Sequence, residues 1–251
     1  MSTKQQTPAP VPEAAPRRPR GRPRKANVNS DSSGLSREAI VLKAAQLAQT
    51  ESLDEISIMR LAREFGVVPG LIHYYIGNRD ELLSGVINHY LRELVAGVPP
   101  SSGDWRADVR RLAQSCMQTM LKHRGVAAYV ATHNRFRLFQ KVGPGETDYG
   151  LEFFNAVGCV LRGGGLAPKA AAMAYHLLMQ FILFSAVSEI SGLTPGRHEG
   201  FILGKLSGLD EERYAGALHM AGEFARLEFK ETFDDAIEML IEGIALRAHP
   251  G

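Results

Sequence analysis

The stretch from Ser57 to Glu81, SIMRLAREFGVVPGLIHYYIGNRDE, determines how the rest of the chain is interpreted. After Ser57, apolar residues recur with the spacing of one helical face. The Ser57 hydroxyl can accept an unpaired N–H of the first turn, and Gly66 stands where a helix needs a positive φ to end. These signals predict a short amphipathic helix that ends in a tight turn.

A second helix is predicted to begin at Pro69, because a first helical position needs no N–H donor. Ile72 and Ile76 then lie on one inward face. Asn78 is a suitable cap for a third helix, and Glu81 follows it three residues later. Two short helices joined by a tight turn have the layout of a helix-turn-helix DNA reader. The residues that must then point outward are Gly70, His73 and Tyr74.

The same residues resemble the TetR family of bacterial transcriptional repressors. The resemblance rests on LAREFGV at 61–67, PG at 69–70 and YIGNRDELL at 75–83, with SREAI at 36–40 upstream. It covers residues 35–95. It implies a homodimer whose two reader helices bind a pseudo-palindromic operator in double-stranded DNA.

The resemblance also implies roles for single residues. Positions 68–71 lie where the family presents side chains to base edges, positions 73 and 74 contact bases or backbone, and positions 75 and 79 contact phosphate. His73 and Ile76 depart from the usual Tyr and Phe, and Val68 replaces a more common polar residue, so we hypothesise apolar contacts to thymine methyl groups. The expected DNA-binding residues are Ser57, Arg60, Val68, Pro69, Gly70, Leu71, His73, Tyr74, Tyr75 and Arg79.

The N-terminal tail, residues 1–34, carries seven Lys or Arg against two Asp or Glu, a net charge of +5, in a chain whose total is +2. Residues 35–95 carry six against eight, a net of −2. The tail has few large apolar residues, so we expect it to be disordered in the free protein. Its segment Arg20-Gly21-Arg22-Pro23 resembles an AT-hook, which binds the minor groove of A·T-rich DNA. The alternative is a basic tail that contacts phosphates without preference.

Every periodic segment after the tail is helical, so the sequence predicts an all-α fold. We expect a helix-turn-helix domain at 35–96, a linker at 97–103 and a larger helical ligand-binding and dimerisation domain at 104–251. Gly125 is predicted to stop the first long helix of that larger domain. The segment Pro168–Ile190 is apolar nearly all round, and the resemblance implies that it forms a four-helix dimer interface with the last helix. Ile182 and Ile241 are expected on that interface.

The larger domain is expected to hold a pocket for an unknown small-molecule effector. Met and aromatic residues at helical spacing are more often core residues than pocket residues, so a place in the core is the main alternative for most candidates. His176 and Gln180 are four residues apart and share a helical face, so they either face a ligand or are satisfied polar groups of the core. The candidates are Met120, His123, Tyr129, His133, Phe136, Tyr149, Tyr175, His176, Met179 and Gln180.

The expected function is a repressor that its ligand releases from the operator. An activator, a repressor aided by its ligand and an architectural protein that coats A·T-rich DNA remain open. The sequence contains no phosphate loop, G-x-S-x-G or H-E-x-x-H motif, so we expect no enzyme activity, catalytic residue, metal or cofactor. Cys116 and Cys159 form no disulfide framework, which favours the cytoplasm. Polar residues interrupt the most apolar helix, so we expect no membrane association.

Overall fold

The computed structural model describes residues 34–133 and 141–248, and these contain helices and no strand, which confirms the all-α prediction. The tail segment Arg20–Pro23 and Phe136 lie outside the described residues. Residues from Leu35 onward form one compact unit. Its helices are α1 Arg37–Leu47, η1 Leu53–Glu55, α2 Ile58–Glu64, α3 Pro69–Ile76, α4 Arg79–Ala96, α5 Trp105–Lys122, α6 Arg124–Thr132, α7 Tyr149–Gly163, α8 Pro168–Ile190, η2 Pro195–His198, α9 Glu199–Leu206, α10 Ala215–Ala225 and α11 Phe229–Ala248.

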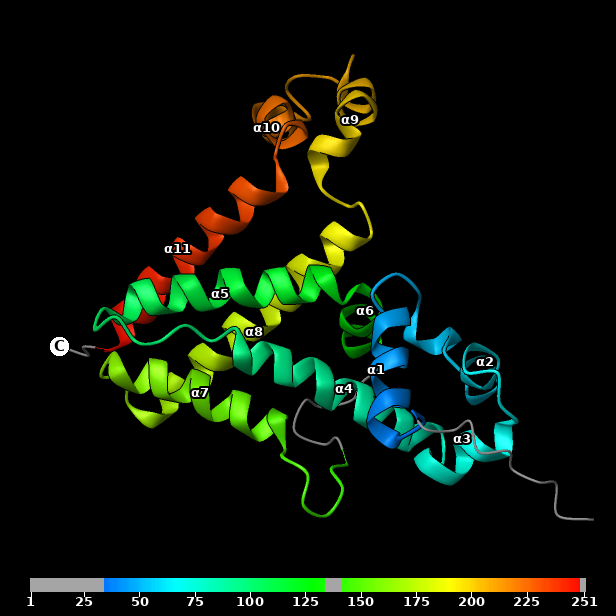
Figure 1. The fold of residues 1–251 in the computed structure, drawn as a ribbon. Helices are drawn as coiled ribbons and strands as arrows, with labels where there is room; N and C mark the ends of the chain where they lie inside the picture. Colours follow the sequence, from blue (N-terminus) through cyan, green and yellow to red (C-terminus); the bar gives the residue numbers. More distant parts are fainter. Residues whose placement is uncertain (1–33, 134–140, 249–251) are drawn as a thin grey trace, which may run out of the picture. The chain divides into compact units, whose positions relative to one another are not determined.

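The first three helices pack together with the start of α4 (Figure 1). Ile40, Leu61 and Ile72 are fully buried at their centre. Ser36 caps α1 by accepting a hydrogen bond from the Ala39 N–H at 3.1 Å, and Asn78 caps α4 through the Glu81 N–H at 3.0 Å. The local sequence chemistry therefore sets where these helices begin.

Helix α4 runs from this small bundle to the rest of the chain and packs against both α1 and α7. Gly85 faces α1 so closely that a Cβ there would lie 2.8 Å from a Val41 methyl carbon. The expected linker at 97–103 corresponds to the connection between α4 and α5, and the division into two domains remains a prediction.

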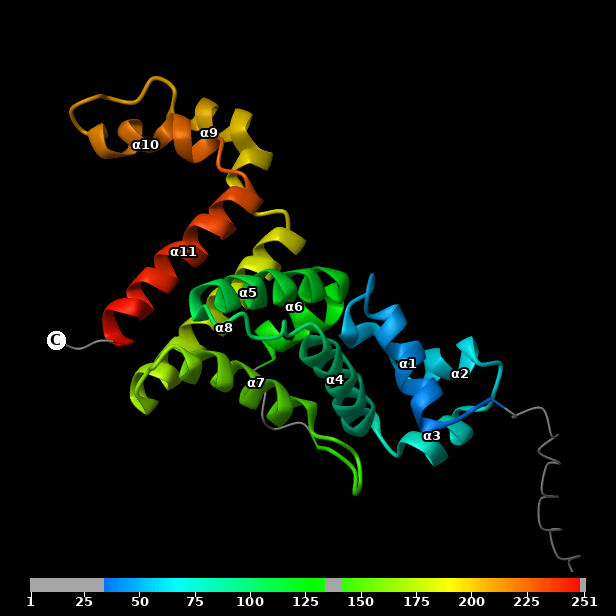
Figure 2. The same cartoon turned by 60° about the vertical axis from the view of Figure 1, so that its left-hand side comes forward.

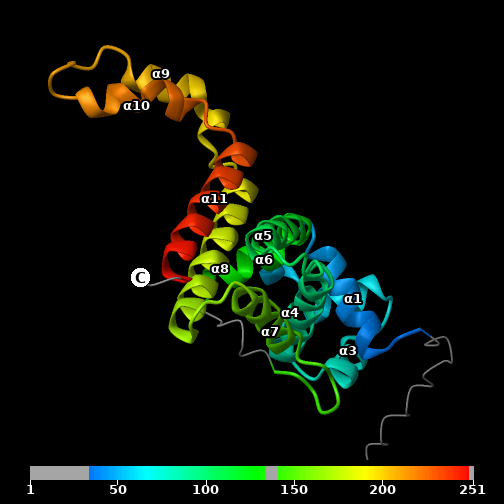
Figure 3. The ribbon, with the colours of Figure 1, turned by 90° about the vertical axis from the view of Figure 1, so that its left-hand side faces the viewer.

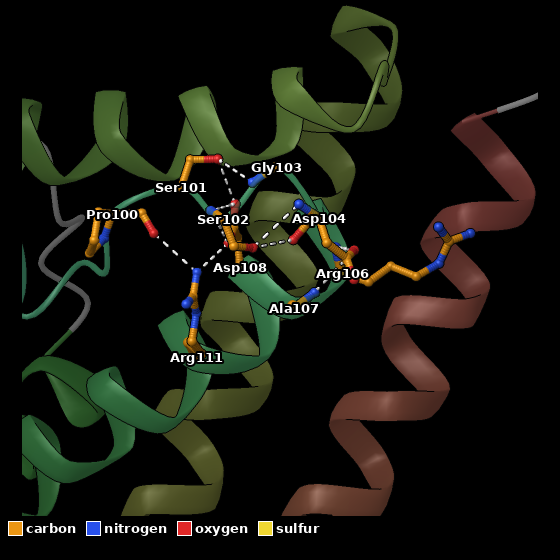
Figure 4. Close-up of polar contacts among 9 residues, drawn as sticks. All are labelled: Pro100, Ser101, Ser102, Gly103, Asp104, Arg106, Ala107, Asp108 and Arg111. Carbon is orange, nitrogen blue, oxygen red and sulfur yellow. Dashed lines mark hydrogen bonds and ion pairs between the residues drawn. The ribbon is translucent and has the colours of Figure 1, made fainter.

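A buried carboxylate organises the connection between α4 and α5 (Figure 4). Asp108 accepts hydrogen bonds from the Ser102 hydroxyl at 2.6 Å, the Ser102 N–H at 2.9 Å and the Ser101 hydroxyl at 2.8 Å, and it pairs with Arg111. The Ser102 hydroxyl is the largest influence on this carboxyl group. It outweighs the opposing effect of burial, so the pKa of Asp108 falls to about 2.

Helices α5 to α8 form the core of the larger bundle. The prediction that Gly125 stops a helix was wrong, because α5 ends at Lys122 and Gly125 lies inside α6. In α7 the buried side chains include Phe153 and Val157, whereas Leu151 is exposed.

Helices α8 and α11 lie side by side in all three ribbon views (Figures 1 to 3). Ile182 and Ile241 are each only 1% exposed within the single chain. Their expected place on a dimer interface is therefore wrong, since they face the chain's own core. The large apolar side chains that α8 and α11 leave exposed are Met173, Leu177, Phe184, Met239 and Leu246. The stretch Pro168–Leu206 is also long and apolar enough to cross a membrane, which is weak evidence because core helices share that composition.

Helices α9 and α10 were not predicted from the sequence. They form a hairpin inserted between α8 and α11, and Figures 2 and 3 show it beyond the ends of those two helices. Both are short, so neither provides a long periodic pattern.

Candidate nucleic-acid interface

The turn between α2 and α3 is fixed by its backbone. Gly66 has a φ of 65°, a conformation that favours glycine. Its N–H donates to the Arg63 carbonyl at 3.2 Å, and the Val67 N–H donates to the Ala62 carbonyl at 2.9 Å. This pair of hydrogen bonds is the Schellman motif, which ends α2 and directs the chain into α3.

Helix α3 buries one side and presents the other to solvent. Ile72 and Ile76 are buried, whereas Val68 is 71% exposed and Tyr74 is 80% exposed. Gly70 and His73 are also exposed, and Pro69, Leu71 and Tyr75 are half-buried. The outward direction predicted for Gly70, His73 and Tyr74 is therefore confirmed, while their contacts with DNA remain predictions.

The aromatic residues of α3 have definite partners. The His73 Nδ1 lies 2.9 Å from the Gly77 carbonyl oxygen, so the ring is directed toward the end of the helix. Tyr74 and Tyr75 meet edge to face, with ring centroids 5.3 Å apart. Tyr74, at 80% exposed, is the most exposed large apolar side chain of α3.

Arg60 and Arg79, the two arginines of the helix-turn-helix region that are predicted to bind DNA, are both paired within the protein. Arg60 forms ion pairs with Glu64 at 2.9 Å and Glu51 at 3.3 Å. Arg79 donates to the Asp54 carboxylate at 3.3 Å and to the Asp54 and Ile56 carbonyls at 3.1 and 3.4 Å. Arg79 therefore also holds the turn before α2, a role that the sequence did not indicate because Asp54 is 25 residues away.

Ser57 has a confirmed structural role. Its hydroxyl accepts a hydrogen bond from the Arg60 N–H at 3.1 Å and caps α2. Its predicted contact with DNA remains a prediction.

Helix α6 directly contacts α1, which packs against the helix-turn-helix pair α2 and α3. The Gly125 N–H donates to the Ala48 carbonyl, at the end of α1, at 2.9 Å. A Cβ at position 125 would lie 2.0 Å from the Glu51 carbonyl oxygen, so only glycine permits this approach. Gly125 is visible in the sequence as a glycine between two helical segments, but a glycine in that place is more simply interpreted as the end of a helix.

A polar contact lies beside this joint. The His133 Nε2 is 3.2 Å from an Asp54 carboxylate oxygen, and the His133 ring stacks on Tyr129 with centroids 4.0 Å apart. Because Asp54 also pairs with Arg79, one carboxylate joins α6 to the start of α4.

Among the described residues, the predicted effector residues differ in how deeply they are buried. Met120, His123, Tyr129 and Met179 are buried in the core, and Tyr149 and Tyr175 are half-buried. His133, His176 and Gln180 are exposed. His176 and Gln180 share a face of α8, as expected, but that face points away from the core of the chain.

His123 has the most unusual environment of these residues. Its Nε2 lies 3.0 Å from a Glu93 carboxylate oxygen, which also accepts from Lys122 at 2.6 Å. Its Nδ1 is buried and has no hydrogen-bond partner among the described residues. Burial would raise the pKa of Glu93, but the bonds from Lys122 and His123 outweigh it and lower that pKa to about 2. His89 lies 3.5 Å from the same carboxylate, and burial lowers the pKa of His89.

The outer side of α8 and α11 carries an apolar groove of about 520 Å³. Gln180 is the one predicted effector residue on its wall. Within the described ranges, no group of three His, Cys, Asp or Glu residues could hold a metal ion. The groove is lined by Leu177, Gln180, Phe181, Phe184, Ser185, Ser188, Thr194, Pro195, Phe229, Thr232, Phe233 and Leu240.

The fold and the reader geometry define a helix-turn-helix protein with a larger helical domain. Residues 99–248, more than half of the chain, match the family described as tetracyclin repressor-like, C-terminal domain. The chain therefore belongs to the tetracycline-repressor-like family.

Relatives of known structure and sequence agree with this family. The chain is similar to ActR of Streptomyces coelicolor in complex with actinorhodin, with 29% identity, a TM-score of 0.72 and coverage of 85% of this chain and 98% of that one. It is 33% identical over 86 residues to the transcriptional repressor Rv1353c of Mycobacterium tuberculosis, which is 34% of this chain and 33% of that protein. It is 34% identical over 77 residues to the regulator BetI of Brucella anthropi, covering 31% and 39%. The chain thus spans about a third of the curated relatives' length.

Proposed function

We propose that this protein is a sequence-specific DNA-binding regulator, and specifically a cytoplasmic, non-enzymatic repressor that a small molecule releases from its operator. The observation that carries the proposal is α3, which buries Ile72 and Ile76 and exposes Val68 and Tyr74 immediately after a rigid turn. An α-helix presented in this way fits the major groove of DNA.

The effector is proposed to bind in the larger domain, with His123 as a polar anchor. A buried imidazole nitrogen without a partner is costly, and a ligand hydroxyl or carbonyl could satisfy it. The similar protein ActR was crystallised in complex with actinorhodin, which supports a regulator that responds to a ligand. The joint between Gly125 and Ala48 provides a path by which a shift of α6 reaches the reader. Coupling between ligand and DNA would be equal in both directions.

The proposed homodimer uses the outer face of α8 and α11. Met173, Leu177, Phe184 and Met239 are exposed there. Exposed apolar patches of this kind mark association surfaces. A two-fold dimer would place two α3 helices on the half-sites of a pseudo-palindrome.

The tail is proposed to add a minor-groove contact through Arg20-Gly21-Arg22-Pro23. This part of the proposal rests on the sequence alone. Because residues 35–95 carry a net charge of −2, positive charge from the tail would support binding to a polyanion.

The test is fluorescence anisotropy on the DNA upstream of the protein's own gene, across a salt series. The full chain is compared with a chain that begins at Gly34, and a scrambled duplex of equal composition is the control. We expect tight binding to a discrete palindrome, with a weaker and less salt-dependent truncated chain, because each phosphate neutralised adds about 0.9 to the salt slope. Equal binding of the scrambled duplex would favour an architectural protein and contradict the proposal.

The ligand's direction of action is tested in the same assay. A compound that binds the larger domain and lowers operator affinity supports the repressor. A compound that raises operator affinity would instead support the activator or ligand-aided repressor.

A further inference from the structure

The hairpin of α9 and α10, with its root, spans residues 195–228 and is called the arm below. Its two ends are tied together, because the Gly196 N–H donates to the Leu227 carbonyl at 3.0 Å and Arg226 pairs with Glu199 at 3.1 Å. A Cβ at position 196 would lie 2.9 Å from a Glu228 carboxylate oxygen and 3.0 Å from the Leu227 carbonyl oxygen. The close approach leaves little room for a side chain at position 196, and the root is a defined joint.

The root is also anchored to the end of α8. Thr194, which is buried, donates to the Glu189 carboxylate at 2.9 Å, and Arg197 pairs with the same carboxylate. The His198 Nε2 lies 2.7 Å from the Gly192 carbonyl oxygen. These contacts give the arm a fixed direction relative to α8.

Beyond the root the arm has almost no core. No residue of α9 is buried, and in α10 only Ala225 is buried. The two helices have 8 and 11 residues, and isolated helices shorter than about 12–15 residues are marginal in water. Burial of an apolar face against another surface would stabilise them.

The arm exposes large apolar side chains on both of its helices. Phe201 is 76% exposed, Met220 is 60% exposed, and Phe224 is also exposed. Helices α9 and α10 pack against each other and against η2, and Figures 2 and 3 show them clear of α5 and α7.

The charge of the arm limits what can cover it. Residues 195–228 carry four Lys or Arg against six Asp or Glu, a net charge of −2. Like charge disfavours association with DNA phosphates or with an anionic lipid surface. An apolar protein surface is the better match.

The position of the arm indicates which protein surface covers it. It is continuous with α8 and α11, whose exposed outer face is the proposed dimer surface, and Thr194 and Pro195 at its root line the apolar groove on that face. A second copy seated on this face would lie next to the arm. We propose that the arm docks on the second copy of this chain and extends the dimer contact beyond α8 and α11, an inference that rests on the dimer of the proposed function.

The test is sedimentation equilibrium of the full chain over a concentration series. The double variant Phe201→Ser/Met220→Ser is compared with the wild type and with Met59→Ser, a matched control on α2 whose side chain is 61% exposed. Because each change occurs twice in a symmetric dimer, we expect the dimer dissociation constant of the double variant to rise at least tenfold, and that of the control to stay unchanged.

Hydrogen exchange gives an independent readout. We expect amides of α9 and α10 to be protected at concentrations where the wild type is dimeric and to exchange rapidly when dilution makes it monomeric. Equal protection in both states, or an unchanged dissociation constant in the double variant, would overturn the inference. Binding of the wild type to neutral phosphatidylcholine vesicles through the arm would also overturn it.

Fluorescence anisotropy on operator DNA distinguishes a failure of this inference from a failure of the proposed function. If the wild type is dimeric and binds its operator while the double variant dimerises equally well, only the arm proposal fails. If the wild type is monomeric at all concentrations and binds no operator, the proposed function itself fails.

Discussion

Replacing Gly125 with alanine tests whether the close contact between α6 and α1 couples the larger helical bundle to the helix-turn-helix region. The new Cβ would lie 2.0 Å from the Glu51 carbonyl oxygen and 2.9 Å from that of Ala48, whereas ordinary contacts begin at 3.4 Å. Both opposing atoms belong to the backbone, so no side chain can turn away. The start of α6 must therefore retreat from α1 by roughly 1 Å or more, which strains the hydrogen bond from Gly125 to Ala48.

The cost can be separated from the general effect of alanine in a helix. Gly158→Ala on α7 is the control, because a Cβ there would meet nothing within 4 Å. Both variants gain about 0.5–1 kcal/mol of helix propensity, and only Gly125→Ala pays for overpacking, about 1–3 kcal/mol. The difference in unfolding free energy between the two variants should therefore be about 1–3 kcal/mol.

The assay is thermal unfolding at one fixed protein concentration, followed by operator anisotropy. For a chain of this size, each kcal/mol corresponds to roughly 2–4 °C in Tm. We expect Gly125→Ala to melt below Gly158→Ala and to show altered operator affinity or a reduced response to ligand. If the two variants are equally stable and bind operator equally, the joint between α6 and α1 is not a rigid contact.

Three further predictions concern other parts of the molecule. Arg79→Ala should weaken operator binding across sequences and make the salt dependence of binding shallower by about 1. Asp54→Asn, measured beside it by anisotropy and thermal melting, should lower stability and leave that salt dependence unchanged. An unchanged salt dependence in Arg79→Ala would rule out its phosphate contact. Phe184→Glu should be a folded monomer when measured by sedimentation, whereas Ile182→Glu should be unfolded when measured by circular dichroism. A dimeric Phe184→Glu would place the interface elsewhere. The folded-state pKa of Glu93 is lowered from 4.5 to about 2, so its contribution to stability is present above pH 4.5 and is lost as the pH falls toward 2. Urea unfolding of Glu93→Gln should therefore show a smaller loss of stability in acid than the wild type does. Identical stability-against-pH profiles of the two proteins would contradict this.

The parts of the fold that follow local rules could be predicted. The caps at Ser36, Ser57 and Asn78 depend on a side chain and a backbone N–H three residues apart, and the buried face of α3 depends on the spacing of Ile72 and Ile76. Such short-range chemistry is visible in the sequence.

Contacts between distant segments could not be predicted. The pairing of Arg79 with Asp54 and the approach of Gly125 to Ala48 join residues far apart in the chain. Helix α8 is apolar on both sides, so periodicity could not tell its inner face from its outer face. The roles of the individual residues on DNA and ligand remain predictions.

The central claim is that the exposed face of α3 reads base sequence. The most direct measurement selects preferred operators from a randomised duplex library with the wild type and with Tyr74→Ala, because Tyr74 is the most exposed large apolar side chain of that helix. We predict that the variant changes base preference at one position in each half of a two-fold symmetric site and keeps the other positions. An identical preferred sequence, bound more weakly and uniformly by Tyr74→Ala, would contradict base readout by this side chain and reassign it to the phosphate backbone.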